Sequence, residues 1–251
     1  MPPRLLLSEL TREEVRALAP EALVVLPTAA IEQHGPHLPI QTDAAICEAI
    51  ARRAAELASA EIRVLVAPTV CYGSSHHHRP YPGVLSLRSD TFLAVLRDLC
   101  ESLILSGFTR IVLLNGHGGN DAAIRQVALD VATQHPVAIA AASYWTIARP
   151  ALLADERART LAALPGHAGA FETACMLALR PDLVTPDRLP VRPAVPPVVA
   201  EPPAFIQRHR ALHALDGFTD NPAQATRELG EHLLGLMSRQ VADFLIQFAR
   251  S

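Results

Sequence analysis

Short apolar runs alternate along this chain with longer stretches in which apolar residues recur at helical spacing. The apolar runs predict strands at Ala22–Leu26, Val64–Pro68, Arg110–Leu114 and Val137–Ser143. These runs are apolar on both faces, as in central strands of a parallel sheet that helices cover on both sides. The alternation of the two patterns predicts one α/β domain spanning residues 1–251.

The stretches with helical spacing predict helices at Asp43–Ser59, Ser89–Gly107, Asn120–His135, about Gly169–Leu179 and Pro222–Phe248. We expect Ser89 to act as an N-cap and Gly107 to stop its helix. The segment Pro181–Pro203 differs from all of these, because it holds eight prolines and no apolar periodicity. We expect it to form an extended connection on the surface rather than a flexible linker between domains.

Composition narrows the functional classes. The net charge of −3 provides no basic surface for nucleic acid. All 22 basic residues are arginine, which excludes a Schiff-base lysine and a P-loop lysine. The four cysteines form no close pair, so we expect buried, reduced thiols at Cys47, Cys71, Cys100 and Cys175.

The apolar patterning also bears on location. No apolar stretch approaches about 18 uninterrupted residues, the length that spans a membrane. Residues Met1–Glu9 lack the charged and apolar regions of a secretory signal. We therefore expect no membrane association and a reducing, cytoplasmic location.

The first candidate for chemistry follows the first predicted strand. Glu32 and His34 are two residues apart in a proline-rich, extended stretch, which places both side chains on one side. Asp43 then opens the next helix, at the sheet edge where α/β proteins bind ligands. These three side chains within twelve residues predict a metal site. The alternative is that Asp43 only caps its helix and His34 lies on the surface.

Two further motifs carry a histidine in a glycine-containing turn. His117 lies in Asn115-Gly-His-Gly-Gly-Asn120, directly after the third predicted strand. A phosphate-binding turn is the alternative there, weakened by the missing lysine and the absence of GxGxxG spacing. His167 precedes Glu172, which lies about one turn into a helix beside an apolar stripe. A buried carboxylate must be paired or metal-bound, whereas an exposed one would only stabilise the helix N-terminus.

Other candidates are aromatic or imidazole side chains near the same edge. Three adjacent histidines end in His77 and His78, and neighbours in an extended chain point alternately, so the three cannot easily bind one ion. We expect His77 and His78 in a substrate-pocket or interface loop, with a plain surface loop as the alternative. Tyr144 and Trp145 end the fourth predicted strand, where they either pack in the core or form a wall of the substrate pocket.

Together these motifs resemble those of the creatininase family. The resemblance runs from about Val24 to Leu183, and the matching blocks stand in the family's order: Glu32-Gln-His-Gly-Pro-His-Leu-Pro39 with Thr42-Asp43, Pro82-Gly83 with Ser86-Leu87, Asn115-Gly-His-Gly-Gly-Asn120, and His167-Ala-Gly with Phe171-Glu-Thr173. It implies a three-layer α/β/α sandwich with a mostly parallel central sheet, a two-metal hydrolytic site, and a homo-oligomer, often a hexamer.

The resemblance also implies roles for particular residues: Glu32 and His117 as ligands of one ion, His34 as a ligand of the other, Asp43 as the bridge between them and His167 as the catalytic histidine. Creatininase itself has a metal-binding glutamate where this chain has Gly119. We expect Glu172 to supply the missing ligand. The departure at Gly119 argues against creatinine as the substrate.

The expected function is therefore that of a metal-dependent amidohydrolase. Mixed nitrogen and oxygen ligands suit two zinc, manganese or iron(II) ions, which would activate a hydroxide to cleave a C–N bond of a small amide, cyclic amide or formamide. No GxSxG elbow is present, and no covalent intermediate is required. A peptidase that trims a modified precursor peptide is one alternative, and a non-catalytic metal- or ligand-binding relative is another.

Overall fold

The computed structural model describes residues 4–190 and 216–251. Its centre is a four-stranded sheet in the order β2-β1-β3-β4. The strands are β1 (Leu23–Thr28), β2 (Val64–Val66), β3 (Arg110–Asn115) and β4 (Ala138–Ser143). All three pairings are parallel, which confirms the α/β class and the parallel sheet expected from the apolar runs.

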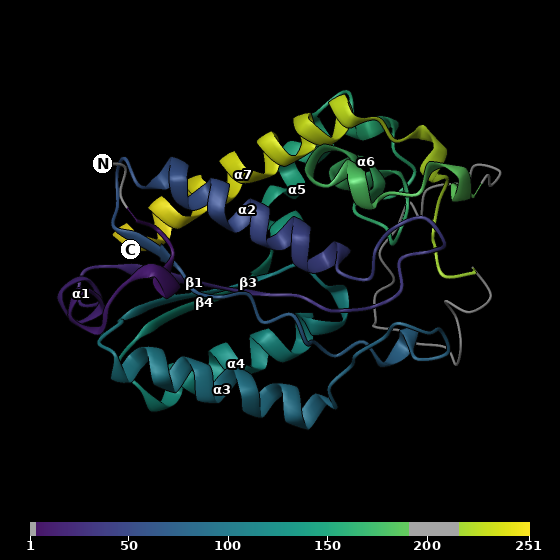
Figure 1. Cartoon of the computed structure of the whole chain (residues 1–251). Coiled ribbons are helices and arrows are strands. Elements are labelled where there is room, and N and C mark those ends of the chain that lie inside the picture. The colour runs from purple at the N-terminus through teal and green to yellow at the C-terminus, as the bar shows by residue number, and fades with distance from the viewer. Residues whose placement is uncertain (1–3, 191–215) are drawn as a thin grey trace.

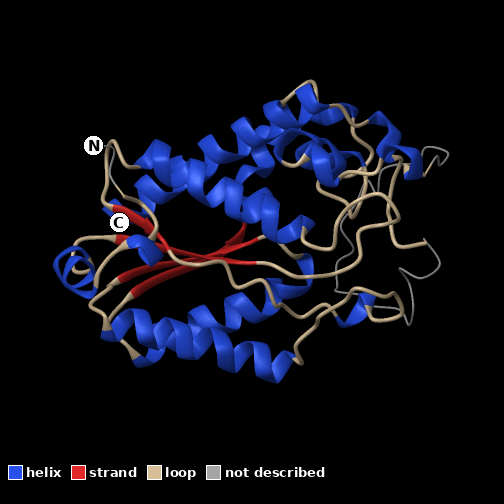
Figure 2. Ribbon diagram, viewed as in Figure 1, coloured by secondary structure: helices blue, strands red, loops and turns tan. Residues whose placement is uncertain are grey.

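Helices cover both faces of this sheet, so the fold has three layers (Figure 1; Figure 2). One layer contains α3 (Ser89–Leu105) and α4 (Asp121–Gln134). The opposite layer contains α2 (Thr42–Ala58), α5 (Tyr144–Ala154), α6 (Ala170–Leu179) and α7 (Arg227–Arg250). Within that layer α7 packs against α2, α5 and α6.

The strands have no polar face because each side of the sheet has its own apolar core. Leu23 and Val25 of β1 pack with α2, α6 and α7. Val24 and Leu26 alternate with them along the strand and point to the other face, where they pack with α3 and α4. This alternation explains the apolar run Leu23–Pro27 in β1, and every residue of that strand is buried, including the polar Thr28 at its end.

Helix boundaries differ from the predicted ones at two caps. Ser89 is the first residue of α3 rather than its N-cap, which is Arg88 with extended backbone. The last helix begins at Arg227, five residues later than expected, because Pro222–Gln224 forms a separate 3-10 turn. Thr226 then caps α7, its side chain accepting a hydrogen bond from the backbone N–H of Leu229 at 3.1 Å.

Two helices were not predicted. The first is α1 (Arg12–Leu18), which is preceded by a capping box between Thr11 and Glu14. The second is α5, which begins at Tyr144 and contains Pro150. Tyr144 therefore opens a helix, together with Trp145, and the expectation that the pair ends a strand is wrong.

The cysteines and the proline-rich segment complete the comparison with the sequence. All four cysteines are free, and all but the half-buried Cys71 are fully buried, as expected. Residues 181–190 of the predicted connection contain two 3-10 turns, Pro181–Leu183 and Pro186–Arg188, and residues 191–203 lie outside the described part of the chain. None of the described helices has the length and apolar character needed to cross a membrane.

Candidate metal centre

The predicted chemistry gathers at the carboxyl ends of β1 and β3. The last residues of these strands, Thr28 and Asn115, are register partners. Asn115 fixes the turn that follows, because its side chain accepts a hydrogen bond from the N–H of His117 at 3.1 Å and donates to the carbonyl of His117 at 2.6 Å. The sheet register thus brings the loop after β1 next to His117.

Asp43, in the first turn of α2, lies at the centre of the cluster. Its Oδ1 is 3.0 Å from Nε2 of His34, and its Oδ2 is 3.0 Å from Nδ1 of His117. Glu172 Oε2 lies 3.6 Å from the same nitrogen of His34. Glu32 Oε1 lies 3.3 Å from the same nitrogen of His117. The carboxylate of Asp43 therefore lies between two pairs, each made of one glutamate carboxylate and one imidazole.

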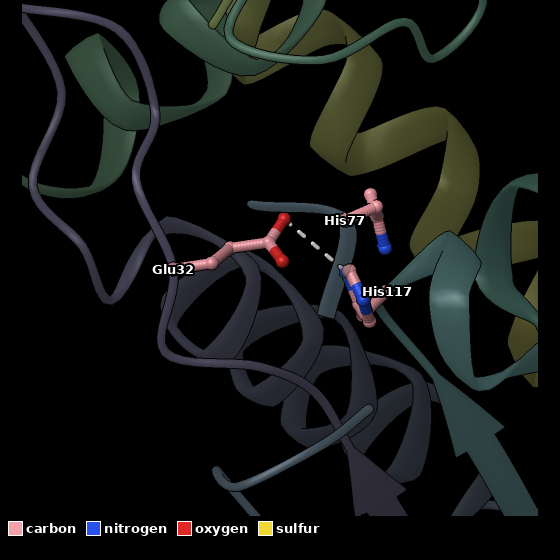
Figure 3. A group of neighbouring side chains, drawn as sticks. All are labelled: Glu32, His77 and His117. Atoms are coloured by element: carbon pink, nitrogen blue, oxygen red, sulfur yellow. Dashed lines mark ion pairs between the residues drawn. The ribbon is translucent and has the colours of Figure 1, made fainter. Parts of the chain in front are cut away.

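The group on the Glu32 side includes a third side chain (Figure 3). The ring of His77 stacks on that of His117, with ring centroids 5.5 Å apart and planes inclined by 10°. Ligand atoms of Glu32, His77 and His117 all lie within 4.8 Å of one another. A Cβ at Gly119 would lie 2.4 Å from His117 Nε2 and 2.9 Å from His77 Cε1, so the two rings occupy the space of a side chain at that position.

Two carboxylate oxygens in this cluster lack a hydrogen-bond donor within residues 4–190 and 216–251: Glu32 Oε1 and Asp43 Oδ2. A buried carboxylate oxygen is costly unless a donor or a cation compensates it. Both oxygens face imidazole nitrogens across gaps of 3.3 and 3.0 Å that do not meet hydrogen-bond geometry. Carboxylate oxygens and imidazole nitrogens are ligand atoms that suit zinc, manganese or iron(II). These side chains therefore fit divalent metal ions.

Glu172, the third residue of α6, is buried, which is the first of the two alternatives that the sequence left open. Its Oε2 accepts a hydrogen bond from the backbone N–H of Ala168 at 2.5 Å. Burial raises the pKa of this carboxyl to about 8, although the neighbouring His34 charge opposes the shift. The carboxylate thus faces His34 and Asp43 from a helix on the opposite side of the cluster to β3.

The histidines fall into two electrostatic classes. Burial opposes the charged form of His34, but the surrounding carboxylates of Asp43 and Glu172 outweigh it and raise the pKa to about 10. His167 is also buried, and burial together with the charge on His34 lowers its pKa to about 3. His34 therefore sits among carboxyl groups that favour its charged form, whereas His167 is neutral over the physiological range.

Two side chains near Glu32, Ser75 and Gln33, were not singled out from the sequence. Ser75 donates a hydrogen bond to Glu32 Oε2. His78 Nε2 and His167 Nδ1 lie 3.4 and 3.6 Å from Glu32 Oε1. The side-chain amide of Gln33 lies between these two histidines, with its Nε2 2.8 Å from His78 Nδ1 and 3.0 Å from His167 Nε2. Ser75 and Gln33 stand inside recognised motifs, but their partners come from distant loops, so no local spacing could reveal their contacts.

A cavity of about 310 Å³ opens onto the cluster. Every predicted site residue lines it except His34 and Tyr144. His34 is fully buried within the cluster. Tyr144 is 1% exposed and packs in the core, which is the first of the two alternatives expected for it. Trp145 lines the cavity, and so does Asp121, which was not predicted. Asp121 Oδ1 accepts hydrogen bonds from Ser143 Oγ at 2.5 Å and from Asn115 Nδ2 at 3.0 Å.

Comparisons with known proteins show the family to which the chain belongs. The family model for Creatininase, creatinine amidohydrolase, matches residues 8–245. The creatinine amidohydrolase of Pseudomonas putida is 31% identical over 245 residues, covering 92% of this chain and 91% of that protein. The mycofactocin precursor peptide peptidase of Mycolicibacterium smegmatis is 31% identical over 242 residues, covering 93% of this chain and 87% of that protein.

Solved structures give the same result. A creatininase with manganese superposes with a TM-score of 0.80 at 29% identity, covering 98% of both chains. A mutant creatininase of Zn–Zn type superposes with a TM-score of 0.78 at 30% identity, also covering 98% of both chains. The family model, the relatives and the fold all lead to one conclusion: this chain is a hydrolase of the creatininase family.

Proposed function

We propose that the chain is a two-metal amidohydrolase that cleaves a C–N bond in a small amide, cyclic amide or formamide. The observation that carries the proposal is the position of Asp43, whose two oxygens each lie 3.0 Å from a different histidine. A carboxylate placed in this way suits a bridge between two ions. His117 and Glu32 would hold one ion, and His34 and Glu172 the other.

Two divalent ions at this place would lower the pKa of a bound water and polarise the carbonyl group of the substrate. The side chains of the protein supply the remaining parts of the reaction. His167 is neutral, lines the cavity and presents Nδ1 to the cluster, so it would accept a proton from the attacking water and deliver it to the leaving nitrogen. Trp145 and His77 would form the walls that orient the substrate.

Glu172 takes the role that the missing side chain at Gly119 leaves open. The space at Gly119 is filled by the His77 and His117 rings, so no ligand can come from that position without moving them. The carboxylate of Glu172 reaches within 3.6 Å of His34 Nε2 from α6. Its burial at 5% exposure also requires a compensating charge, which a metal ion would supply.

The proposal is tested by removing the metal with a chelator and refilling the protein with zinc, manganese or iron(II) in turn. Each form is assayed on cyclic amides, formamides and linear amides, and its metal content is measured in parallel. We expect hydrolysis of at least one amide class that vanishes on chelation and returns on refilling with close to two ions per chain. Hydrolysis that is unaffected by complete metal removal would contradict the proposal.

The peptidase alternative rests on the similarity to the mycofactocin precursor peptide peptidase. The cavity of about 310 Å³ lies at the small end of the range for ligand pockets. Assays on short peptides with a free carboxyl end, beside small cyclic amides, distinguish the peptidase from the amidohydrolase. Faster cleavage of the peptides would favour the peptidase.

A non-catalytic role as a metal- or ligand-binding protein is the remaining alternative. It is disfavoured because His167 is not required to hold either ion, yet its ring lies against the cluster, 4.4 Å from the His34 ring. A binding protein has no need for a neutral imidazole at that place. The absence of turnover on all amide and peptide substrates, in protein that carries both ions, would support this alternative.

The proposed setting is a homo-oligomer, such as a hexamer, in the cytoplasm. Four unpaired cysteines are consistent with a reducing compartment. Light scattering on the purified protein measures the number of chains in the assembly.

A further inference from the structure

Gln33 lies between two histidines of the site and is held in one orientation by backbone groups. Its Oε1 accepts a hydrogen bond from the N–H of Gly35 at 2.9 Å, and its Nε2 donates to the carbonyl of Gly217 at 3.0 Å. A backbone N–H can only donate and a carbonyl can only accept, so the amide cannot be turned over. A Cβ at position 217 would lie 2.4 Å from Oε1, so the chain there approaches the amide closely.

In this orientation the side-chain amide of Gln33 has fewer hydrogens than it has neighbouring acceptors. Gln33 Nε2 carries two hydrogens and lies near three acceptors: the Gly217 carbonyl at 3.0 Å, His78 Nδ1 at 2.8 Å and His167 Nε2 at 3.0 Å. His167 Nε2 is also 3.0 Å from the backbone carbonyl of Gln33, which can only accept. If His167 carries its proton on Nε2, it donates to that carbonyl, and the two amide hydrogens serve Gly217 and His78.

The opposite arrangement satisfies fewer groups. If the amide donated to a bare Nε2 of His167, then either His78 Nδ1 or the Gly217 carbonyl would lose its hydrogen, and the Gln33 carbonyl would lose its donor. Gln33 is 7% exposed and His78 is 1% exposed, so such losses would be buried and costly. The first arrangement is therefore the stable one.

We propose that Gln33 is a positioning residue that fixes the tautomers of His78 and His167. Both rings carry their proton on Nε2. His78 then directs an N–H toward Glu32 Oε1 at 3.4 Å, while His167 presents a bare Nδ1 to the same oxygen at 3.6 Å. Resting on the function proposed above, this assignment makes His167 Nδ1 the atom that accepts the proton from water, and it places the protonated Nε2 of His78 beside a carboxylate that would bind metal.

The tautomers can be read directly, without turnover. Protein labelled with ¹⁵N-histidine is loaded with zinc, and the ring nitrogens of His78 and His167 are identified by the signals that disappear in His78→Gln and His167→Gln. We expect both rings to show a protonated Nε2 and an unprotonated Nδ1 at neutral pH. A wild-type His167 with its proton on Nδ1 would overturn the proposal, whether or not any variant folds.

Two substitutions then test the role of the amide. Gln33→Glu keeps the acceptor for Gly35 but removes both donors, and Gln33→Met removes all hydrogen bonding at similar length. Gln126→Met, on the exposed face of α4, is the matched control, because that amide bonds only Asp130 among the described contacts. Metal content and thermal unfolding are measured for each variant.

For both Gln33 variants we expect unchanged metal content, a changed ring signal of His78, and a fall in kcat of about 10–100-fold with little change in KM. The control should match the wild type in all four measurements. Unchanged ring signals and kcat in a folded Gln33→Glu would contradict the assignment. A wild-type protein that binds no metal would instead defeat the proposed function, while the tautomers of the two rings would still be measurable.

Discussion

The two sides of the candidate centre differ in how the protein surrounds them. On the α6 side, His34 is fully buried, and Glu172 is held by a backbone N–H of the loop that precedes its helix. On the β3 side, Glu32 Oε1 lies within 3.6 Å of three different imidazole rings and has no hydrogen-bond donor among the described residues. Asp43 belongs to both sides.

This difference indicates that the two sides have different roles in the proposed reaction. On the α6 side, His34 is fully buried and does not line the cavity, so this side is suited to holding an ion. The β3 side combines an ion-binding pair with neutral histidines, burial having lowered the pKa of His78 to about 2 and of His167 to about 3. We therefore expect proton transfer on the β3 side and mainly structural binding on the α6 side.

The largest effect should come from the residue that the two sides share. Asp43→Ala removes the bridge, so we expect loss of both ions and a fall in kcat/KM of roughly 10³-fold or more, corresponding to several kcal/mol of transition-state stabilisation. Asp98→Ala, on the exposed surface of α3, is the control and should leave metal content and rate unchanged. Retention of both ions in Asp43→Ala, measured by elemental analysis, would break the division into two sides.

The next effect tests proton transfer on the β3 side. His167→Ala should retain both ions, because the groups His34, Asp43 and Glu172 on one side and Glu32, His77 and His117 on the other could each hold an ion without it. Turnover should fall by about 10²–10⁴-fold, the range for loss of a general acid–base group. Paired measurements of metal content and kcat check this result, and an unchanged kcat would remove His167 from the mechanism.

A pair of isosteric substitutions distinguishes the two sides. Glu172→Gln should weaken the ion beside His34 and spare the ion beside His117, whereas Glu32→Gln should do the reverse. Each variant should therefore retain close to one ion per chain after dialysis against a weak chelator. Two ions in Glu172→Gln would leave Glu32 as a ligand and remove Glu172 from the set.

The three adjacent histidines offer a smaller, internally controlled test. His77 lines the cavity and His76 does not, although the two are neighbours in the same 3-10 turn. We expect His77→Ala to raise KM by about tenfold, worth roughly 1.4 kcal/mol, and His76→Ala to have little effect. If His77→Ala instead releases an ion while KM is unchanged, His77 is a ligand on the β3 side and not a wall of the substrate pocket.

The pH dependence of metal binding should have a definite sign. Without a metal, His34 has a pKa of about 10 and Glu172 one of about 8, so both carry a proton at pH 7. An ion needs the neutral imidazole and the ionised carboxylate, so binding releases protons and the affinity should increase as the pH rises from 6 toward 8. Calorimetric titrations in two buffers of different ionisation enthalpy measure this release, and identical heats in both buffers would contradict it.

Much of the framework could be predicted because it depends on local patterns. Each strand has an apolar run, since β1 and β3 are buried on both faces. The helix α5 was missed because Pro150 and the alanine-rich strand before it hide the boundary at Tyr144. The helix α1 did have a local signal, the Thr11–Glu14 capping box, and could have been found from it.

The candidate centre was predictable residue by residue but not in its pairwise contacts. Glu32, His34 and Asp43 are close in sequence, and the strand ends bring His117 to them. The contact between Glu172 and His34 depends on how α6 packs against α2, which no spacing encodes. The hydrogen bonds of Gln33 to His167, through its backbone carbonyl, and to Gly217, through its side chain, join segments 134 and 184 residues apart, so only the folded chain reveals them.

The central claim is that Asp43 bridges two metal ions, and anomalous diffraction tests it most directly. Crystals of the refilled protein, measured on both sides of the absorption edge of the added metal, locate each ion independently of any assay. The account predicts two anomalous peaks, one between Asp43 Oδ1 and His34 and the other between Asp43 Oδ2 and His117. A single peak, or two peaks that leave Asp43 bound to only one ion, would contradict it.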